Sequence, residues 1–263
     1  MKHKILNTEL KNKCIYIMTL NNSSKRNPLS FELINILLKE FVYIKKNKDI
    51  KVVIIKSTGP SFCSGHDLKE VKQSSSSKKM LIELFKTCSK MMLAIRSLPL
   101  PVIACVDGVA AAAGCQLVAS CDLAIASKEA SFQTPGVNIG LFCSTPMVAI
   151  SRKVQIKDMM YMLLSGDVVK ASDAKGIGLI NEVVIKKNLD KKVMEIANKI
   201  ASKSFQSIKI GKEAFYKQLE MPIEKAYAYT SKVMTKNMQA RDAKEGVNAF
   251  IEKRKPVWDR ESD

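Results

Sequence analysis

The apolar positions along the first two thirds of the chain show two kinds of pattern, one typical of buried strands and one typical of helices. Short, nearly continuous apolar runs at residues 14–20, 52–56, 104–106 and 123–125 predict buried strands. Between these runs, apolar residues recur at helical spacing, which predicts helices that pack on one face. Because strands alternate with helices as far as about residue 185, the pattern predicts an α/β layered fold.

Two helices in this region have clear boundaries. Ser30 is expected to cap a helix that runs to about Asn47 and buries one apolar face, formed by Leu33, Ile36, Leu37, Phe41 and Ile44. A second helix is predicted over residues 79–97 and is closed by two prolines that follow it. The serine-rich run at 73–77, which precedes the second helix, is expected to be a flexible loop.

The chain changes character near residue 188. From there on the spacing predicts successive helices, at 188–202, 204–219, 223–238 and 241–253, with Pro222 marking a break. We therefore predict an α/β core over residues 1–185 and a C-terminal helical region over residues 186–263. Met and Tyr residues at helical spacing in this region indicate a packing or oligomer surface rather than a cofactor site.

Composition narrows the class of protein. With 46% hydrophobic residues in 263, the chain can bury one large core. The formal charge of +18 comes from lysines scattered over the chain, usually at helix ends or on polar faces, so we interpret it as solvated surface charge. Only 6% of residues are aromatic and none interleave with basic runs, which argues against a nucleic-acid partner.

Cysteine usage and hydropathy bear on the compartment. The seven cysteines are odd in number and form no Cys-x-x-Cys pair, which is typical of a reducing, intracellular compartment. With only two histidines, no metal site is expected. No apolar stretch reaches the roughly 18 to 20 residues that span a bilayer, so a soluble protein is expected. Residues 1–13 are short and poor in arginine for a transit peptide, yet they leave both the mitochondrial matrix and the cytosol open.

The most informative segment is rich in small residues. Between Gly108 and Gly114 the main chain can pass close to a ligand, and residues 115–121 predict a short buried helix. A helix that starts near Ala113 directs unpaired amides at whatever lies in front of it. A second glycine-containing turn, at 61–69, follows the strand at 52–55. Two such amides on one oxygen form an oxyanion hole, although each turn alone is more often structural.

The order of the motifs carries a family resemblance. Before the first long helix stands Arg26-Asn-Pro-Leu-Ser30, and later come Phe62-Cys-Ser-Gly-His-Asp-Leu68 and the segment that ends at Ser120-Cys-Asp-Leu123. The segments 132–146, 171–180 and 250–256 follow. In this order the motifs resemble the enoyl-CoA hydratase/isomerase (crotonase) superfamily over nearly the whole chain. Within it, they look most like the branch of enoyl-CoA hydratase domain-containing protein 3.

This resemblance implies a fold, a ligand and an assembly. The fold is a spiral of ββα turns, followed by C-terminal helices that build homotrimers, often paired into hexamers. The ligand is an acyl-CoA thioester of fatty acid metabolism, with coenzyme A as part of the substrate and no tightly bound cofactor. The activity is of the lyase or isomerase type.

The resemblance also implies roles for individual residues. The backbone N–H groups of His66 and Ala113 would bind the thioester carbonyl. Lys69 and the loop with Arg26 and Pro28 would lie near the nucleotide part of coenzyme A. Two further contacts would come from a neighbouring subunit, through Phe250 and Lys253. Two alternatives stay open: Lys253 as an ordinary exposed lysine, and the His66 ring as a rim residue without a catalytic role.

One departure from the family pattern bears on mechanism. Hydratases of this superfamily use two glutamates to activate water, and the corresponding residues here are Gln116 and Gly136. Since glutamine cannot exchange a proton near neutral pH, ordinary hydration is expected to be slow or absent. Cys143 is read as a buried small hydrophobe rather than a nucleophile. Two hypotheses follow: an enzyme acting on an acyl- or enoyl-CoA thioester, or a non-catalytic acyl-CoA binder or assembly subunit.

Overall fold

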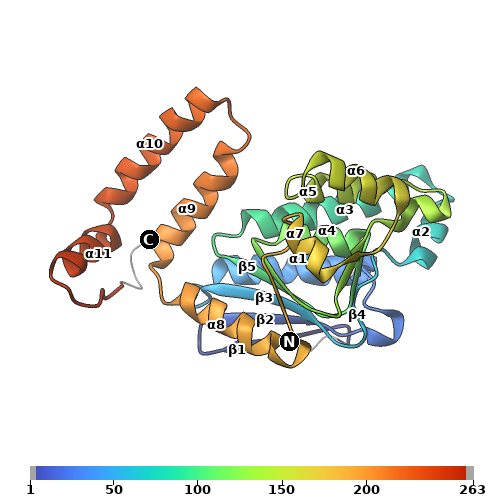
Figure 1. Ribbon diagram of the computed structural model, residues 1–263, viewed down its shortest axis with the longest axis horizontal. Coiled ribbons are helices and arrows are strands. Elements are labelled where there is room, and N and C mark those ends of the chain that lie inside the picture. The colour runs from blue at the N-terminus through green and yellow to red at the C-terminus, as the bar shows by residue number, and fades with distance from the viewer. Residues whose placement is uncertain (1–3, 259–263) are drawn as a thin grey trace.

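The computed structural model describes residues 4–258, which form two sheets surrounded by helices (Figure 1). The larger sheet has six strands in the order β1 (Leu6–Lys11), β2 (Ile15–Leu20), β3 (Val52–Ser57), β5 (Val102–Val106), β7 (Leu123–Ser127) and β10 (Glu182–Val184). The smaller sheet has four, in the order β4 (Ser61–Cys63), β6 (Val109–Ala111), β8 (Ser131–Gln133) and β9 (Val169–Lys170). Only β1 and β9 run antiparallel to their neighbours within these sheets.

The helices follow the strand pairs along the chain. They are α1 (Phe31–Lys46), α2 (Leu68–Ser74), α3 (Lys78–Ser97), α4 (Ala113–Ser120), α5 (Ser144–Ile150), α6 (Ile156–Ser165), α7 (Ala171–Gly176), α8 (Leu189–Ala201), α9 (Phe205–Gln218), α10 (Ile223–Gln239) and α11 (Arg241–Ile251). Short 3-10 helices are η1 (Ser23–Lys25), η2 (Pro135–Ile139) and η3 (Lys186–Asn188).

Each turn of the chain gives one strand to each sheet and then forms a helix. The pairs β3 and β4, β5 and β6, and β7 and β8 repeat this path, with parallel pairing inside both sheets. The repeat confirms the predicted ββα spiral and its α/β class. It also places the ends of β4 and β6, which precede α2 and α4, at one edge of the smaller sheet.

Most of the predicted elements are present, but the short strands β4, β6, β8, β9 and β10 were not predicted, and two further points need correction. The Ser30 Oγ accepts the Leu33 N–H at 3.2 Å and caps α1 as expected, and the four C-terminal helices lie within about two residues of the predicted ranges. The run at 73–77 is not wholly a loop, because Gln73 and Ser74 complete α2. The strand β1 was not predicted, since only its first residue is buried and it lies at the edge of the sheet.

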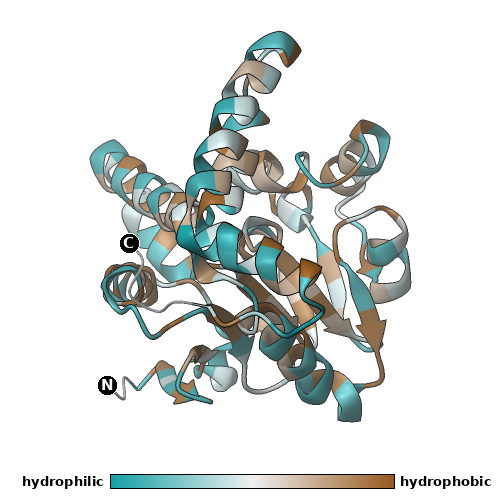
Figure 2. Ribbon diagram, turned by 90° about the vertical axis from the view of Figure 1, so that its left-hand side faces the viewer, coloured by the Kyte–Doolittle hydropathy of each residue, from teal (hydrophilic) through white to brown (hydrophobic). Residues whose placement is uncertain are grey.

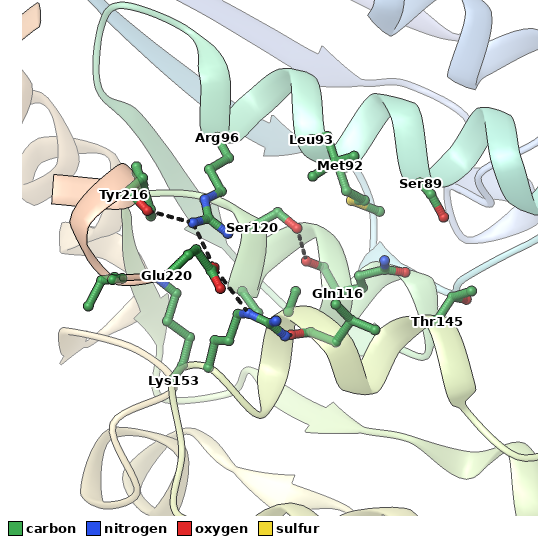
Figure 3. A pocket seen from close by; sticks show the side chains of 15 residues that line it. Ser89, Met92, Leu93, Arg96, Gln116, Ser120, Thr145, Lys153, Tyr216 and Glu220 are labelled. Atoms are coloured by element: carbon green, nitrogen blue, oxygen red, sulfur yellow. Dashed lines mark hydrogen bonds and ion pairs between the residues drawn. The ribbon is translucent and has the colours of Figure 1, made fainter. Parts of the chain in front are cut away.

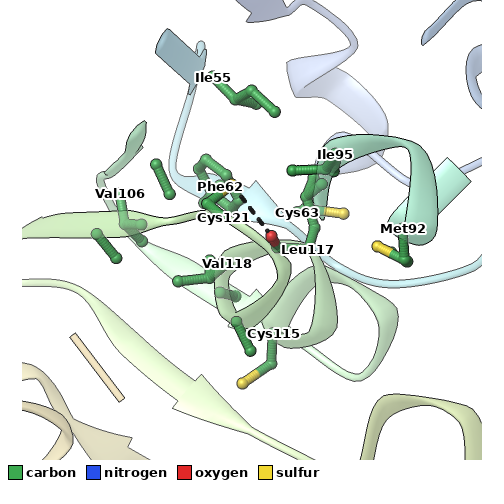
Figure 4. Packing of buried hydrophobic residues seen from close by; sticks show 14 of the residues in the cluster. Ile55, Phe62, Cys63, Met92, Ile95, Val106, Cys115, Leu117, Val118 and Cys121 are labelled. Atoms are coloured by element: carbon green, nitrogen blue, oxygen red, sulfur yellow. Dashed lines mark hydrogen bonds between the residues drawn. The ribbon is translucent and has the colours of Figure 1, made fainter. Parts of the chain in front are cut away.

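The core lies between the sheets and the helices, and α4 is buried along almost its whole length. Figure 4 shows side chains of β4, α4 and α3, among them Phe62, Leu117 and Ile95, gathered in this core. Cysteines fill several of these places as small apolar groups, and of the seven only Cys14 is not buried. Burial raises the pKa of the Cys63, Cys88 and Cys115 thiols to about 12.

The other face of the larger sheet is covered by α8. Because side chains alternate across a strand, β2, β3, β5 and β7 present a second set of apolar residues to Leu189, Val193 and Ala197 of this helix. Figure 2 shows brown, hydrophobic residues gathered on the central strands and teal, hydrophilic ones on the outer helices. The division at residue 185 stays a prediction, and α8 is part of the packing of the sheet.

Helices α9, α10 and α11 extend away from the sheets as an arm (Figure 1). Several contacts join α9 to the body: Lys212 Nζ lies 2.6 Å from Asp122 Oδ2, the Tyr216 hydroxyl donates to Asp122 Oδ1 at 2.8 Å, and Arg96 Nη2 donates to the Tyr216 carbonyl at 2.9 Å. No residue of α10 is buried, and the arm exposes large apolar side chains, among them Phe215, Leu219, Ile223, Tyr227 and Phe250. Within residues 4–258, no helix combines the length and apolar character that crossing a bilayer requires.

Candidate functional site

The first turn of α4 directs main-chain N–H groups out of the helix. Ala113 is its first residue and is fully buried, so its N–H has no partner within the helix. Ala112, just before it, has φ 49° and ψ −115°, a conformation that residues with a side chain rarely adopt. The Ala112 N–H donates to the Gln133 carbonyl at 2.9 Å, which ties this turn to β8.

The turn after β4 meets the start of α4. A β-carbon built on Gly65, which has φ 93°, lies 3.0 Å from the Ala111 oxygen and 3.4 Å from the Ala113 nitrogen. The residue before His66 therefore lies close to Ala113, with room for little more than a hydrogen at its α-carbon. Among residues 4–258, no acceptor takes the N–H of either His66 or Ala113.

Gly114 allows this approach. A β-carbon at this position would overlap the main chain of Cys63, so only glycine lets α4 pack so closely on β4. The two glycine-containing turns that the sequence singles out thus lie side by side.

The loop of Arg26 and Pro28 is attached to the same turn. The Ser64 N–H donates to the Arg26 carbonyl at 3.1 Å, and the Leu29 N–H donates to the Gly65 carbonyl at 2.7 Å. Pro28 is buried, whereas the Arg26 side chain is exposed. Sequence reasoning missed Asn27, which is fully buried, has φ 51° and donates to the Thr58 and Ser61 carbonyls at 2.8 Å each.

Lys69 lies on the other side of the turn. It is an exposed residue in the first turn of α2, and its N–H donates to the Asp67 carboxylate at 2.9 Å. Asp67 is the N-cap of α2, which is a structural role.

The His66 ring packs into the protein rather than into solvent. Its edge meets the Phe85 ring, with centroids 5.5 Å apart and planes at 84°. Both ring nitrogens are buried and have no hydrogen-bond partner among the described residues. Burial lowers the pKa of His66, which keeps the ring neutral at pH 7.

A cavity of about 440 Å³ runs beside α4, between α3, α5 and α9 (Figure 3). Gln116 lines one part of it, is only 4% exposed and has a buried Oε1 atom without a partner in residues 4–258. The one carboxylate among the residues that line the cavity belongs to Glu220, at the end away from Gln116 (Figure 3).

Gly136 lies in η2 and is buried. A β-carbon there would lie 2.9 Å from the Leu141 carbonyl oxygen and 3.0 Å from the Cys143 Sγ, so main chain occupies the space of a side chain. Cys143 is itself buried, and this burial raises the pKa of its thiol. It packs as a small apolar residue, as the sequence indicates.

Two residues that were predicted to contact coenzyme A lie far from the turns at His66 and Ala113. Phe250 is 85% exposed on α11, and Lys253 follows that helix with φ 54°. Helix α11 packs against α9 and α10, at the opposite end of the molecule from α2 (Figure 1). One chain therefore does not bring these residues to the turns at His66 and Ala113.

Metal ligands do not gather in the described part of the chain. No group of three or more His, Cys, Asp or Glu side chains in residues 4–258 is arranged to hold a metal ion.

Known proteins resemble this chain over nearly its whole length. It is 48% identical over 244 residues to the human enoyl-CoA hydratase domain-containing protein 3, mitochondrial, covering 93% of this chain and 80% of the relative. The short-chain-enoyl-CoA hydratase of Clostridium acetobutylicum is 31% identical over 249 residues, covering 92% of each chain.

Solved structures agree with the fold. An enoyl-CoA hydratase of Mycobacterium smegmatis superimposes with a TM-score of 0.95 at 43% identity, covering 97% of this chain and 99% of the other. The human enoyl-CoA hydratase domain-containing protein 3 superimposes with a TM-score of 0.93 at 46% identity, covering 97% and 100%. The family model described as enoyl-CoA hydratase/isomerase matches residues 10–261. The chain therefore belongs to the enoyl-CoA hydratase/isomerase family.

Proposed function

We propose that this protein binds an acyl- or enoyl-CoA thioester and holds its carbonyl oxygen with the backbone N–H groups of His66 and Ala113. The observation that supports the proposal is that Gly65 lies close to Ala113 and that the N–H groups of His66 and Ala113 have no acceptor in the described chain. Two convergent main-chain donors are the usual means of stabilising charge on a carbonyl oxygen.

The reaction supported best is one in which negative charge develops on the thioester. Such a hole stabilises an enolate or a tetrahedral oxyanion, and each donor is worth roughly 10² to 10³ in rate. Gln116 lies in the first turn of α4, three residues after Ala113, and its amide can orient a water or a substrate group. The protons then move through water or the substrate.

Ordinary hydration is not well supported. Gln116 has no carboxyl group, and Gly136 has neither a side chain nor the space for one. Glu220 lines the cavity but its Oε1 atom is engaged by Arg96 at 3.0 Å. We therefore assign a lyase or isomerase type of activity on acyl-CoA, in fatty acid metabolism, in which hydration is at most slow.

The rest of the ligand is assigned by position. The exposed Arg26 and Lys69 side chains flank the turn at His66 and suit the phosphates of coenzyme A. Phe250 and Lys253 would reach the ligand of a neighbouring subunit in a homotrimer or hexamer, and the apolar side chains exposed on the arm support such an assembly. Coenzyme A enters as part of the substrate, and no tightly bound cofactor is proposed.

We propose the mitochondrial matrix as the compartment of this protein. The human and rodent relatives are named mitochondrial, which supports the mitochondrial matrix over the cytosol.

The second candidate function, a non-catalytic acyl-CoA binder or assembly subunit, is favoured by the absence of both glutamates.

One substitution tests the hole directly. Ala113→Pro removes the N–H at the first position of α4 and places the proline ring where the thioester oxygen is expected. We expect conversion or binding of acyl-CoA to fall on the order of 10²-fold. The matched control is Ile156→Pro, at the exposed first position of α6, which keeps wild-type behaviour.

A panel of saturated and 2,3-unsaturated acyl-CoA thioesters separates the two candidate functions. Binding with conversion supports the enzyme, and binding without conversion supports the non-catalytic binder. The absence of acyl-CoA binding, or an Ala113→Pro variant that is folded and as active as the wild type, overturns the proposal.

A further inference from the structure

The cavity beside α4 is polar at one end, apolar in the middle and cationic at the other end. Gln116, Ser89 and Thr145 lie toward one end in Figure 3, and Arg96, Lys153, Tyr216 and Glu220 lie toward the other. Apolar side chains of Met92, Leu93, Ala119, Val148 and Ala149 line it as well.

The arrangement of the residues that line the cavity follows from their spacing along the helices. Helix α3 presents Ser89, Met92, Leu93 and Arg96, and the segment from α5 presents Thr145, Val148, Ala149 and Arg152. Both sets follow the i, i+3, i+4, i+7 pattern, which places them on one face of each helix. Arg96 lies near the end of α3, and Arg152 lies in the turn two residues beyond the end of α5.

The charges at this end do not balance. Three cations line it, from Arg96, Arg152 and Lys153, against the single carboxylate of Glu220. One atom, Glu220 Oε1, faces both guanidinium groups, at 3.0 Å from Arg96 Nη2 and 3.8 Å from Arg152 Nε. Arg96 Nη2 also donates to the Tyr216 carbonyl at 2.9 Å, and Arg152 Nη1 donates to the Val148 carbonyl at 2.8 Å. Since each guanidinium has five N–H donors in a planar fork, these contacts still leave donors for a second anion.

This end is also partly open to water. The side chains of Arg96, Arg152 and Glu220 are 29%, 52% and 55% exposed. A charged group can therefore enter without losing all of its hydration, which a closed apolar end would demand.

We infer that the cavity selects acyl chains that end in a carboxylate, the ω-carboxyacyl thioesters, through Arg96 and Arg152. The inference rests on the proposed function, because it takes the thioester to lie at the start of α4. The chain would run beside α4, whose eight residues span roughly 10 Å at 1.5 Å per residue. It would place its far carboxylate beside the two arginines that Glu220 Oε1 bridges.

The test compares chains of equal length that differ only at the end. We would measure dissociation constants of octanoyl-CoA, suberoyl-CoA and free CoA by calorimetry at constant ionic strength. A charge-assisted contact of about 1.5 kcal/mol predicts that suberoyl-CoA binds roughly tenfold more tightly than octanoyl-CoA. In Arg152→Met, which alters the more exposed arginine, and in Arg96→Met, this ratio should fall toward one.

A control variant separates local contacts from net charge. Lys157→Met removes one exposed positive charge on α6, which does not line the cavity, and should keep the wild-type ratio. Circular dichroism checks that each variant is folded. If Arg96→Met unfolds the arm, Arg152→Met still decides the result.

The outcomes distinguish this inference from the proposed function. A wild-type ratio of one, or a ratio that survives loss of both arginines, overturns the inference but leaves acyl-CoA binding in place. Weaker binding of free CoA in Arg152→Met, equal to the loss for suberoyl-CoA, also overturns it, because the arginine would then bind the nucleotide. No binding of any thioester overturns the proposed function itself.

Discussion

Gly114 of α4 packs directly against the main chain of Cys63 in β4, with no room for a side chain between them. This contact holds the start of α4 beside the turn of Gly65 and His66. It therefore sets the distance between the two N–H groups on which the proposed chemistry depends.

Gly114→Ala should destabilise the protein and weaken acyl-CoA binding. The new β-carbon meets main chain, which cannot rotate away, so we expect a loss of about 1 to 3 kcal/mol in the free energy of unfolding. Urea denaturation measures it. The control is Gly211→Ala, which meets open space inside α9 and should stabilise by about 0.4 to 1 kcal/mol. Equal stability of Gly114→Ala and the wild type would contradict the packing described above.

Lys212→Met should detach the arm from the body. The pair of Lys212 and Asp122 is mostly buried, with side chains 8% and 16% exposed, and Lys212 also donates to the Leu100 carbonyl at 2.9 Å. Removing one partner of a buried pair costs about 3 to 5 kcal/mol, so a loss near the lower value is expected.

The matched control for that variant is Lys56→Met. Lys56 pairs with Asp190, whose side chain is 71% exposed, and an exposed pair contributes at most about 1 kcal/mol. Thermal or urea denaturation of both variants makes the comparison. Losses of the same size would show that burial of the Lys212 pair contributes nothing extra.

Gln116→Glu should raise hydration of crotonyl-CoA. The substitution keeps the size of the side chain and adds a group that can exchange protons, an effect worth on the order of 10²-fold. The rate is followed by the absorbance of the enoyl thioester. An unchanged rate in a variant that still binds crotonyl-CoA would show that Gln116 does not limit hydration.

Restoring the second carboxylate, at position 136, is expected to fail for steric reasons. Gly136→Glu has to displace the Leu141 carbonyl or Cys143, so we expect it to lower stability rather than to complete the pair. Gln116→Glu is thus the informative single change.

Thiol reagents should distinguish Cys14 from the other cysteines. Cys14 is partly exposed, whereas the other six are buried. Since the thiolate is the reactive form, a pKa of about 12 at Cys63, Cys88, Cys105 and Cys115 leaves almost none at pH 8. A chromogenic disulfide should report one fast thiol in the native protein and seven in denaturant. Fast reaction of a second thiol in the folded protein would contradict the packing.

Stability should fall in alkaline solution. The folded-state pKa of these four thiols is raised from 9.0 to about 12, so their contribution is complete below pH 9 and is lost between pH 9 and 12. Each thiol contributes a slope of up to about 1.4 kcal/mol per pH unit. Lys212, whose pKa burial lowers, opposes this as a single group. Urea denaturation of Cys88→Ala should show a smaller slope than the wild type, and an identical slope would contradict the assignment.

Local patterns in the sequence were enough for much of the fold. The cap at Ser30, the helix at 113–120 and the C-terminal helices depend on residues a few positions apart, so periodicity and capping predict them. The two glycine turns could also be found, because small residues before a helix mark close approaches of the main chain.

Long-range features could not be predicted in the same way. The order of strands, the edge strand β1 and the meeting of Arg96, Arg152 and Glu220 depend on contacts between distant parts of the chain. Nothing near Arg152 in the sequence indicates that Glu220 lies beside it. The crowding at Gly136 comes from the backbone at Leu141, which residue types do not reveal.

The position of the arm also affects the cavity beside α4. Tyr216 lies on α9 and Glu220 just beyond its end, so the root of the arm is also one wall of the cavity. In the proposed assembly, a shift of α9 on association would change the shape of the cavity. By thermodynamic reciprocity, a ligand bound against that wall would then change the free energy of subunit association by the same amount. Ligand binding and subunit association would then be thermodynamically coupled through α9.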